Sequence, residues 1–288
     1  MKNPGREVRR FKDNNERVSK SLRVAVRLAY LGQGFAGWQR QTVLRTVQGE
    51  LEWALEKLYG TPVTVIGAGR TDAGVHAAGQ VAHFDPPREL SPHGLLAALN
   101  TLLPGDVRVL GVRRVPAGFH ARRSASRKIY RYRIAWGAPL APWEAQRRVL
   151  LPGPLALPAM EAAAQLLTGT HDFAAFARAG HAGTGRRGTT RTLQGIRLIS
   201  RGRRLDLVLA ADGFLRGMAR RLVGALLEVG RGAQPVHWVE LLVSGAGTRP
   251  PAPTAPAYGL TLERVVYCRR ATNARPRPGA PSPFAAAS

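Results

Sequence analysis

Residues 63–84, VTVIGAGRTDAGVHAAGQVAHF, combine two short apolar runs with a glycine-rich turn between them. The runs Val63–Gly67 and Gln80–Phe84 have the length and the apolar content that favour strands. Glycine in the turn lets the backbone bend sharply and lets another group approach it closely. The segment therefore predicts two strands joined by a tightly folded loop.

The elements that flank this segment follow from the spacing of their apolar residues. Arg23–Tyr30 alternates apolar and basic residues, which predicts a strand. Thr46–Tyr59 has apolar residues at helical spacing, its first residue can cap a helix, and the glycine that follows can end it. A second helix and a further strand follow at Ser91–Leu103 and Val107–Val115. The resulting β-α-β-β-α-β order is the ferredoxin-like plan.

The second half of the chain repeats this order without obvious sequence identity to the first. Its predicted elements are Ser126–Trp136, Ala159–Leu167, Thr190–Ser200, Arg203–Ala210, Phe214–Val229, Val236–Val243 and Leu260–Tyr267. We therefore expect an α+β fold of two ferredoxin-like (RRM-like) βαββαβ halves. A central cleft would lie either between two sheets or across one continuous sheet.

Composition and element order divide the chain into four parts. Residues 1–22 are polar and basic, and we expect a flexible arm there. Residues 23–117 form the half that carries the glycine-rich loop, and residues 118–268 form the second half. Residues 269–288 are rich in Pro, Ala and Arg, which predicts a disordered tail.

The chain is strongly basic, with 43 Lys and Arg residues against 18 acidic residues and a formal net charge of +25. Such a charge attracts polyanions, and nucleic acid is the usual partner. The one cysteine, Cys268, excludes an intramolecular disulfide. The first 22 residues lack the apolar core of a signal peptide, and no run of 18 apolar residues could span a membrane. We therefore expect a cytoplasmic protein that binds nucleic acid.

Asp72 is the candidate catalytic residue of the glycine-rich loop, because it is the only acid between Glu56 and Asp85. A carboxylate beside Arg70 in a basic protein should stay ionised, since opposite charge favours the charged form. An ionised, positioned carboxylate can act as a nucleophile. The alternative is a structural aspartate that caps a turn and pairs with Arg70.

Aromatic and basic residues alternate in the strand Ser126–Trp136, where Lys128, Tyr130 and Tyr132 share one face. Aromatic rings next to cations suit stacking on an unstacked base beside a phosphate backbone. The alternative is an amphipathic strand with tyrosines in the core. We favour the core for Tyr132, and for Tyr130 both interpretations stay open.

Further arginines could contact RNA or the catalytic carboxylate. On the predicted helix Phe214–Val229, Arg216 and Arg220 are one turn apart, so they would share a face that either contacts Asp72 or RNA, or is simply solvated. Phosphate contacts provide salt-dependent affinity without reading sequence, and surface arginines can equally be solvated. The candidates for such contacts are Arg122, Arg123, Arg186, Arg187 and Arg191.

The sequence lacks the motifs of several other functions. Gly32–Gly37 matches G-x-G-x-x-G, but in a dinucleotide site the last glycines open a helix directly, and here the predicted helix starts near Thr46. There is no P-loop and no zinc-deaminase pattern, and the histidines show no metal-binding spacing. An RNA-binding module without chemistry would not explain the GRTDAG string, and Asp72 has no acidic neighbour for a metal-dependent nuclease.

The string GAGRTDAGVHAAGQVAHF at residues 67–84, with Trp38-Gln39-Arg40-Gln41 upstream, resembles the tRNA pseudouridine synthase A family. Phe119-His120-Ala121-Arg122, Tyr130-Arg131-Tyr132 and Phe214–Gly230 match in the same order, so the resemblance covers roughly residues 23–267. It departs from the family pattern at Leu31, at Arg216-Gly217 and at Arg221, where family members usually have Asp, His-His and Asn.

The resemblance implies a specific set of roles. Asp72 would be the nucleophile, Tyr130 would contact the substrate, and Arg220 would pair with the catalytic carboxylate, with Arg70 as a second cation able to orient it. It further implies a homodimer that needs neither cofactor nor metal. Its substrates would be uridines 38, 39 and 40 in the anticodon stem-loop of tRNA.

Overall fold

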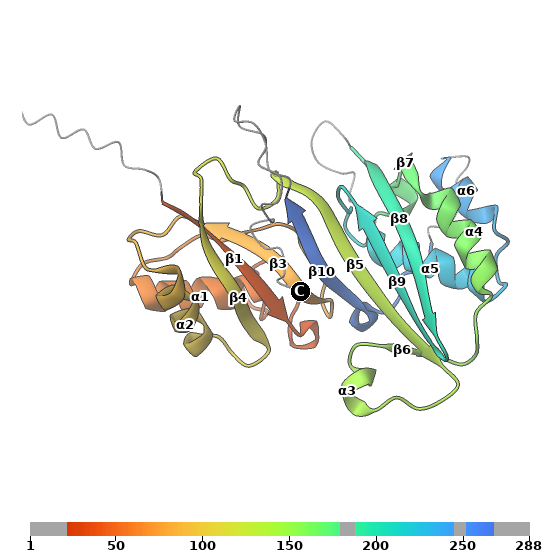
Figure 1. The fold of residues 1–288 in the computed structure, drawn as a ribbon, viewed down its shortest axis with the longest axis horizontal. Helices are drawn as coiled ribbons and strands as arrows, with labels where there is room; N and C mark the ends of the chain where they lie inside the picture. The colour runs from red at the N-terminus through yellow and green to blue at the C-terminus, as the bar shows by residue number, and fades with distance from the viewer. Residues whose placement is uncertain (1–21, 179–187, 245–251, 268–288) are drawn as a thin grey trace, which may run out of the picture.

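A computed structural model describes residues 22–178, 188–244 and 252–267, which form one mixed sheet with helices packed on it (Figure 1). The sheet of the described part has ten strands in the order β4-β1-β3-β10-β5-β9-β8-β7, with β2 paired to β3 and β6 paired to β5. Because this path is continuous, the cleft expected from the sequence lies across one sheet and not between two.

The first half contains the expected strands and helices in the expected order. They are β1 (Arg23–Tyr30), α1 (Val47–Tyr59), β2 (Ile66–Gly67), β3 (His76–Phe84), α2 (Pro92–Leu102) and β4 (Val107–Val115). β1 pairs antiparallel with both β3 and β4, and β2 pairs antiparallel with β3. The side chains of Thr46 and Ser91 cap the two helices by accepting from Gly49 and Gly94, and Gly60 ends α1 in the left-handed conformation.

The second half repeats this arrangement and adds short elements. Its main elements are β5 (Ala125–Trp136), α4 (Leu157–Leu167), β8 (Thr190–Arg201), β9 (Arg204–Ala211), α5 (Met218–Gly230) and β10 (Leu260–Tyr267). β5 pairs antiparallel with β9 and β10, and β8 pairs with β9. The α+β fold of two ferredoxin-like halves is therefore confirmed. The short elements added in the second half are α3 (Pro142–Ala145), β6 (Val149–Leu151), β7 (Gly169–Asp172), η2 (Ala174–Phe176), α6 (Trp238–Val243) and η3 (Ala257–Gly259), and the first half adds η1 (Gly32–Gly34).

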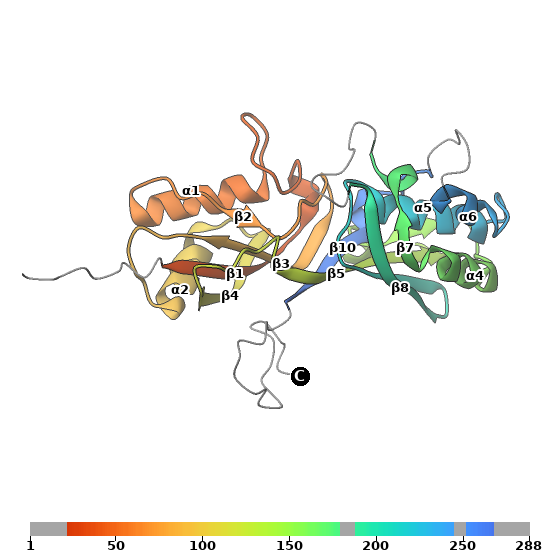
Figure 2. The ribbon, with the colours of Figure 1, turned by 90° about the horizontal axis from the view of Figure 1, so that it is seen from above.

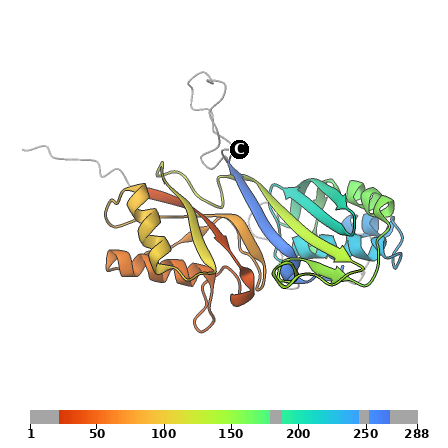
Figure 3. The same cartoon turned by 60° about the horizontal axis from the view of Figure 1, so that its bottom comes forward.

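The last described strand joins the two halves. β10 lies between β3 and β5, as Figure 3 shows. It pairs with β5 along its length but with β3 only at its start, where Thr261 and Leu262 lie opposite His76 and Ala77. The loop between β2 and β3, residues 68–75, therefore ends where the two halves meet.

The core lies between the sheet and the helices. Val24, Val26 and Leu28 of β1 and alternate leucines of β9 are buried, as the period of two predicts. α1 and α5 lie on the same side of the sheet (Figure 2). None of the described helices is both long enough and apolar enough to cross a bilayer.

Two predicted boundaries were wrong. α5 begins at Met218 and not at Phe214, because Gly217 has a φ of +77° and forms the N-cap. Arg216 therefore precedes the helix and does not share a helical face with Arg220. The strand predicted at Val63–Gly67 is reduced to the two residues of β2, since only these pair with β3.

Candidate active site

Asp72 lies in the loop between β2 and β3, and close backbone packing fixes this loop. The amide of Trp38 donates to the Thr71 carbonyl oxygen at 3.0 Å. Gly37 has a φ of +100°, and a Cβ at this position would lie 2.7 Å from the same oxygen, so the contact requires glycine. The buried Trp38 ring packs on Gly67, where a Cβ would lie 2.5 Å from the ring. Gly37 and Gly67 therefore allow the close packing that holds this loop.

Polar side chains fix the same loop from the sheet. The Tyr30 hydroxyl and the Thr71 hydroxyl lie 2.9 Å apart, and Gln80 Nε2 donates to the Gly69 carbonyl oxygen at 2.8 Å. Burial raises the pKa of Tyr30 to about 12, so this phenol is neutral at physiological pH. Asp72 thus follows a residue that is fixed through both its backbone and its side chain.

The C-terminal half supplies the cation nearest to Asp72. Arg220 Nη1 lies 3.7 Å from Asp72 Oδ2, and both side chains are about one-fifth exposed. Arg220 Nε donates to the Ala255 carbonyl oxygen at 2.7 Å, and the Ala255 amide donates back to the Arg220 carbonyl oxygen at 3.2 Å. Gly224 permits this close approach, because a Cβ there would lie only 1.8 Å from the Pro253 carbonyl oxygen. Arg220 is therefore oriented toward the carboxylate by its own half.

Asp72 opens into a cavity of about 300 Å³ at the junction of the halves. Its other lining residues come from the second half and are Arg178, Gly217, Arg220, Arg221 and Thr254. Sequence reasoning missed Arg178 and Thr254 as site residues. Neither has a motif around it, and only the packing of η2 and of residues 252–256 against α5 brings them beside Asp72.

Tyr130 lies on β5 next to this site, with only 6% of its surface exposed. Its ring packs edge-on against Phe214 with the centroids 4.9 Å apart. Burial raises the pKa of Tyr130, and the neighbouring Tyr30 phenol and the negative charge of Asp72 raise it further, so the Tyr130 phenol stays neutral beside the carboxylate. Tyr132 is fully buried and donates to the Pro256 carbonyl oxygen at 3.0 Å, so it is the core residue that we favoured.

Arg70 does not pair with Asp72 in the structure. Among the described residues, Arg220 is the cation within ion-pair distance of this carboxylate, and Arg70 is exposed. Burial lowers the pKa of Arg122, and repulsion from Arg70 lowers it further, so these two guanidinium groups lie near one another. The structure therefore does not contain the Asp72–Arg70 pair that was the alternative interpretation of Asp72.

The exposed Arg122 and Arg123 lie on an ordered turn between β4 and β5. Their amides both donate to His120 Nδ1 at 3.2 Å, and the Ala121 amide donates to His83 Nδ1 at 3.1 Å. The turn therefore presents both side chains from a fixed backbone. Arg186 and Arg187 lie outside the described residues.

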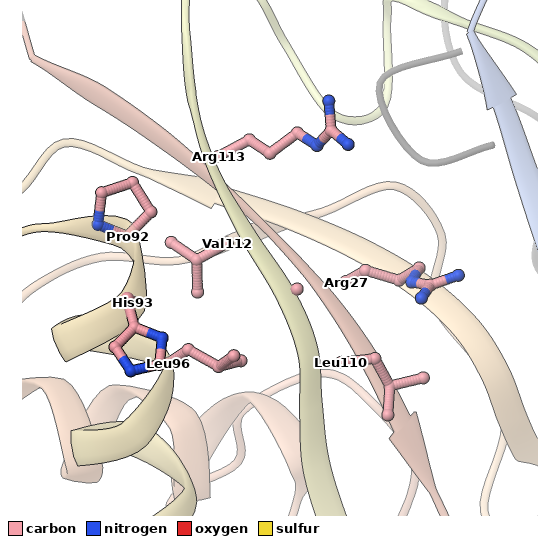
Figure 4. Close-up of a pocket in the computed structure, with 8 residues that line it drawn as sticks. Arg27, Pro92, His93, Leu96, Leu110, Val112 and Arg113 are labelled. Carbon is pink, nitrogen blue, oxygen red and sulfur yellow. The ribbon is translucent and has the colours of Figure 1, made fainter. Parts of the chain in front are cut away.

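A second cavity, of about 330 Å³, lies at the β4 edge of the sheet (Figure 4). The residues labelled there include Arg27 and Arg113 of β1 and β4 and His93 of α2. Its lining contains no carboxylate, and in Figure 4 both guanidinium groups point away from His93. The Asp72 cavity is therefore the candidate active site. No cluster of three potential metal-ligating side chains occurs in the described ranges.

Several known proteins have sequences similar to this chain. The sequence profile of the tRNA pseudouridine synthase family matches residues 27–122 and 163–268, together more than half of the chain. The chain is 38% identical over 252 residues to tRNA pseudouridine synthase A 1 of Desulfotalea psychrophila, covering 85% of this chain and 99% of that protein. It is 45% identical over 251 residues to tRNA pseudouridine synthase A of Frankia casuarinae, covering 85% and 89%.

The chain belongs to the tRNA pseudouridine synthase family.

As a member of this family, the chain is an isomerase that converts uridine in tRNA to pseudouridine. The resemblance deduced from the GRTDAG string is therefore confirmed. Asp72 and Arg122 lie in the first matched segment, Arg220 lies in the second, and Tyr130 lies between the two. One chain of a solved Cbf5-Nop10-Gar1 complex aligns with this structure at a TM-score of 0.31 and 12% sequence identity. The alignment covers 71% of this chain and 45% of that one, and its TM-score is too low to carry an argument.

Proposed function

We propose that this tRNA pseudouridine synthase modifies uridines 38, 39 and 40 of the anticodon stem-loop, with Asp72 as its nucleophile. The observation that carries the proposal is the cavity in which Asp72 of one half faces Arg220 of the other at 3.7 Å. The position of the target uridines rests on the family resemblance. The target base must leave its stack to reach Asp72, which costs a few kcal/mol.

The proposed reaction rearranges one nucleotide and conserves its atoms. The Asp72 carboxylate attacks either C6 of the uracil or C1′ of the ribose, and the N1–C1′ bond breaks. The freed base rotates, C5 bonds to C1′ and the bond to Asp72 breaks. C5 then loses its proton to solvent, and N1 takes up one proton in exchange. Arg220 orients the carboxylate, and Tyr130 stacks on the base. Because the product is an isomer of the substrate, the overall reaction consumes no oxidant or reductant.

RNA docking is assigned to the exposed arginines around the site. Arg70, Arg122 and Arg123 would contact backbone phosphates, and Arg186 and Arg187 are proposed on sequence alone. Each such contact makes affinity fall with salt without changing sequence preference. A cytoplasmic homodimer is proposed from the family resemblance. Sedimentation of the purified chain tests the dimer.

The decisive test is tritium release from stem-loops that carry 5-tritiated uridine at position 38, 39 or 40, with EDTA present. Release from each RNA supports the proposed substrate, whereas strand cleavage would indicate a nuclease. Binding without either would indicate an RNA-binding module.

Asp72→Asn tests the nucleophile itself. We expect turnover to fall by at least about 10⁴-fold, because a neutral amide cannot form the covalent bond. Asp85→Asn is the matched control, since Asp85 pairs with Arg23 away from the cavity. RNA affinity and the melting temperature of Asp72→Asn should stay near wild type. Substantial turnover by Asp72→Asn would remove Asp72 from this role.

A further inference from the structure

The cavity that contains Asp72 has an excess of positive charge. Asp72 is its only acidic lining residue, while Arg178, Arg220 and Arg221 all line it. Arg220 is matched by Asp72. In the ranges that the structure describes, no acidic side chain lies within ion-pair distance of Arg178 or Arg221. Two guanidinium groups of the cavity are thus left without a carboxylate partner among these residues.

These two arginines are neighbours. Hydrogen bonds hold the Arg221 guanidinium, whereas Arg178 is exposed and is held through its backbone. Arg221 Nη1 donates to the carbonyl oxygens of Ala177 and Ala175 at 2.8 and 3.3 Å, and the Arg178 amide donates to the Arg216 carbonyl oxygen at 2.8 Å. Burial lowers the pKa of Arg221, and repulsion from Arg178 lowers it further. An anion between the two would remove this repulsion and would be attracted by both charges.

The start of α5 adds positive potential to the same place. Gly217, the N-cap of this 13-residue helix, lines the cavity. No side chain caps the helix, and its first turn contains no acidic residue. Helix N-termini carry a partial positive charge and present amide donors, which favours anions. The hydroxyl of Thr254 on the opposite segment is a further donor.

We propose that Arg178 and Arg221 form a subsite for a backbone phosphate that flanks the target uridine. The inference rests on the proposed function of Asp72 and names a further part of its substrate site. A neutral uracil would leave the two charges unmatched, whereas a phosphodiester supplies one negative charge and two acceptor oxygens. A cavity of about 300 Å³ is at the small end of ligand sites, which suits one nucleotide. The subsite would fix the swung-out nucleotide while Asp72 reacts.

The test is a double-mutant cycle between the protein and the RNA. The probes are anticodon stem-loops in which one methylphosphonate linkage removes the charge of the phosphate on the 5′ or the 3′ side of the target uridine. Dissociation constants are measured by fluorescence anisotropy for wild type, Arg178→Gln and Arg221→Gln. For wild type, one of the two linkages should weaken binding by about 10-fold.

Arg178→Gln and Arg221→Gln should each bind the unmodified stem-loop about 10-fold more weakly than wild type does. In each variant, the methylphosphonate linkage that weakens wild-type binding should raise the dissociation constant by less than about 2-fold. The linkage whose effect on binding is not additive with the substitutions shows whether the bound phosphate lies on the 5′ or the 3′ side of the target uridine. Arg201→Gln is the matched control, because Arg201 is exposed at the end of β8 and loses the same charge outside the cavity. Its effect should be small and additive with both linkages.

Additive effects of both linkages in both cavity variants would overturn the subsite. Melting temperatures identify a variant that fails to fold. Arg178→Lys, which keeps the charge, then replaces that variant. It should preserve the wild-type sensitivity of binding to the linkage. Loss of that sensitivity in a folded Arg178→Lys variant would require the planar guanidinium. Tritium release by wild type is read separately, so a failure of the proposed reaction is distinguished from a failure of the subsite.

Discussion

The two halves of the molecule place their site residues by different means. In the first half, Asp72 sits on an irregular loop that is fixed by backbone contacts with Trp38 and by side chains from β1 and β3. In the second half, Tyr130 and Arg220 come from regular elements, β5 and α5. The two halves share one fold but place their site residues differently. The first half holds Asp72 on a loop, and the second half presents Tyr130 and Arg220 from a strand and a helix.

This difference indicates a division of roles. A loop fixed by close contacts can hold a carboxylate at one position, but a single misplaced atom in its packing would disturb it. The position of a residue in a strand or helix depends on the backbone hydrogen bonds of that element and on the core beneath it. A side chain there can therefore be changed without disturbing the backbone. Substitutions in the second half should therefore alter chemistry, and substitutions beneath the loop should alter both chemistry and stability.

After Asp72→Asn, the largest effect on turnover is expected from Arg220→Ala. Removing the guanidinium 3.7 Å from Asp72 should lower kcat by about 10² to 10³-fold, because one preorganised charge at a reacting group contributes that much. Stopped-flow or single-turnover tritium release measures it. Arg216→Ala removes an exposed arginine just before the same helix and should change the single-turnover rate far less. Equal rates for wild type and Arg220→Ala would show that the carboxylate needs no orienting partner.

A smaller effect is expected at Tyr130. Tyr130→Ala should lower turnover by about 10- to 100-fold, because stacking on a base contributes about 1–3 kcal/mol. Tyr130→Phe keeps the ring and its packing against Phe214, so its turnover should stay within a few-fold of wild type. If the alanine variant matched wild type, Tyr130 would belong to the core alone.

Beneath the loop, Gly67→Ala tests the close packing of the first half. The added Cβ would lie 2.5 Å from the Trp38 ring, so we expect the free energy of unfolding to fall by about 1–3 kcal/mol and turnover to fall with it. Urea unfolding measures the first quantity. Gly105→Ala is the control, since nothing lies within 4 Å of a Cβ there, and its change should stay within about 0.5 kcal/mol. An unchanged Gly67→Ala variant would mean that the loop tolerates displacement.

The smallest effect concerns His83, which fixes the turn of Arg122 and Arg123 through Ala121. Burial, together with the positive charges of Arg23 and His120, lowers the pKa of His83 to about 4. Between pH 6.5 and 4 the unfolded chain binds a proton that the native chain does not, so stability should fall as pH falls, by up to about 1.4 kcal/mol per pH unit.

His83→Asn should reduce this slope, because Asn can accept the Ala121 amide but does not titrate. Part of the slope should remain, since the pKa values of His76 and His120 are also lowered, in both cases mainly by burial. Thermal unfolding across this pH range measures the difference. An identical slope in wild type and variant would exclude His83 as its source.

Much of the fold was predictable because periodicity and caps are local. The alternation of Arg23–Tyr30, the Thr46 cap and the Gly60 stop all appear in the structure as expected. The start of α5 was not predicted correctly, because the apolar stripe does not reveal the positive φ of Gly217, which lies beside Arg178. β6 and β7 were missed, since short strands have little periodicity of their own.

The candidate site was predictable only in part. The glycine-rich string identified Asp72 as a candidate, and the alternation in β5 placed Tyr130 on one face with Lys128 and Tyr132 without deciding its role. The roles of Asp72 and Tyr130 stay predictions. The residues alone left both Arg70 and Arg220 open as the partner of Asp72, and only the family resemblance favoured Arg220. In the structure Arg70 is exposed although it is two residues away in sequence, whereas Arg220 is 148 residues away and lies 3.7 Å from Asp72.

By itself, the sequence determined the two βαββαβ halves, the basic character and the loop that carries the candidate carboxylate, since these depend on local spacing and composition. The tertiary structure alone decided that β10 joins the halves into one sheet and that Arg178, Arg221 and Thr254 surround Asp72. The physical reason is that ion pairs and cavities form between side chains brought together by the packing of distant segments, and no local pattern encodes which segments meet.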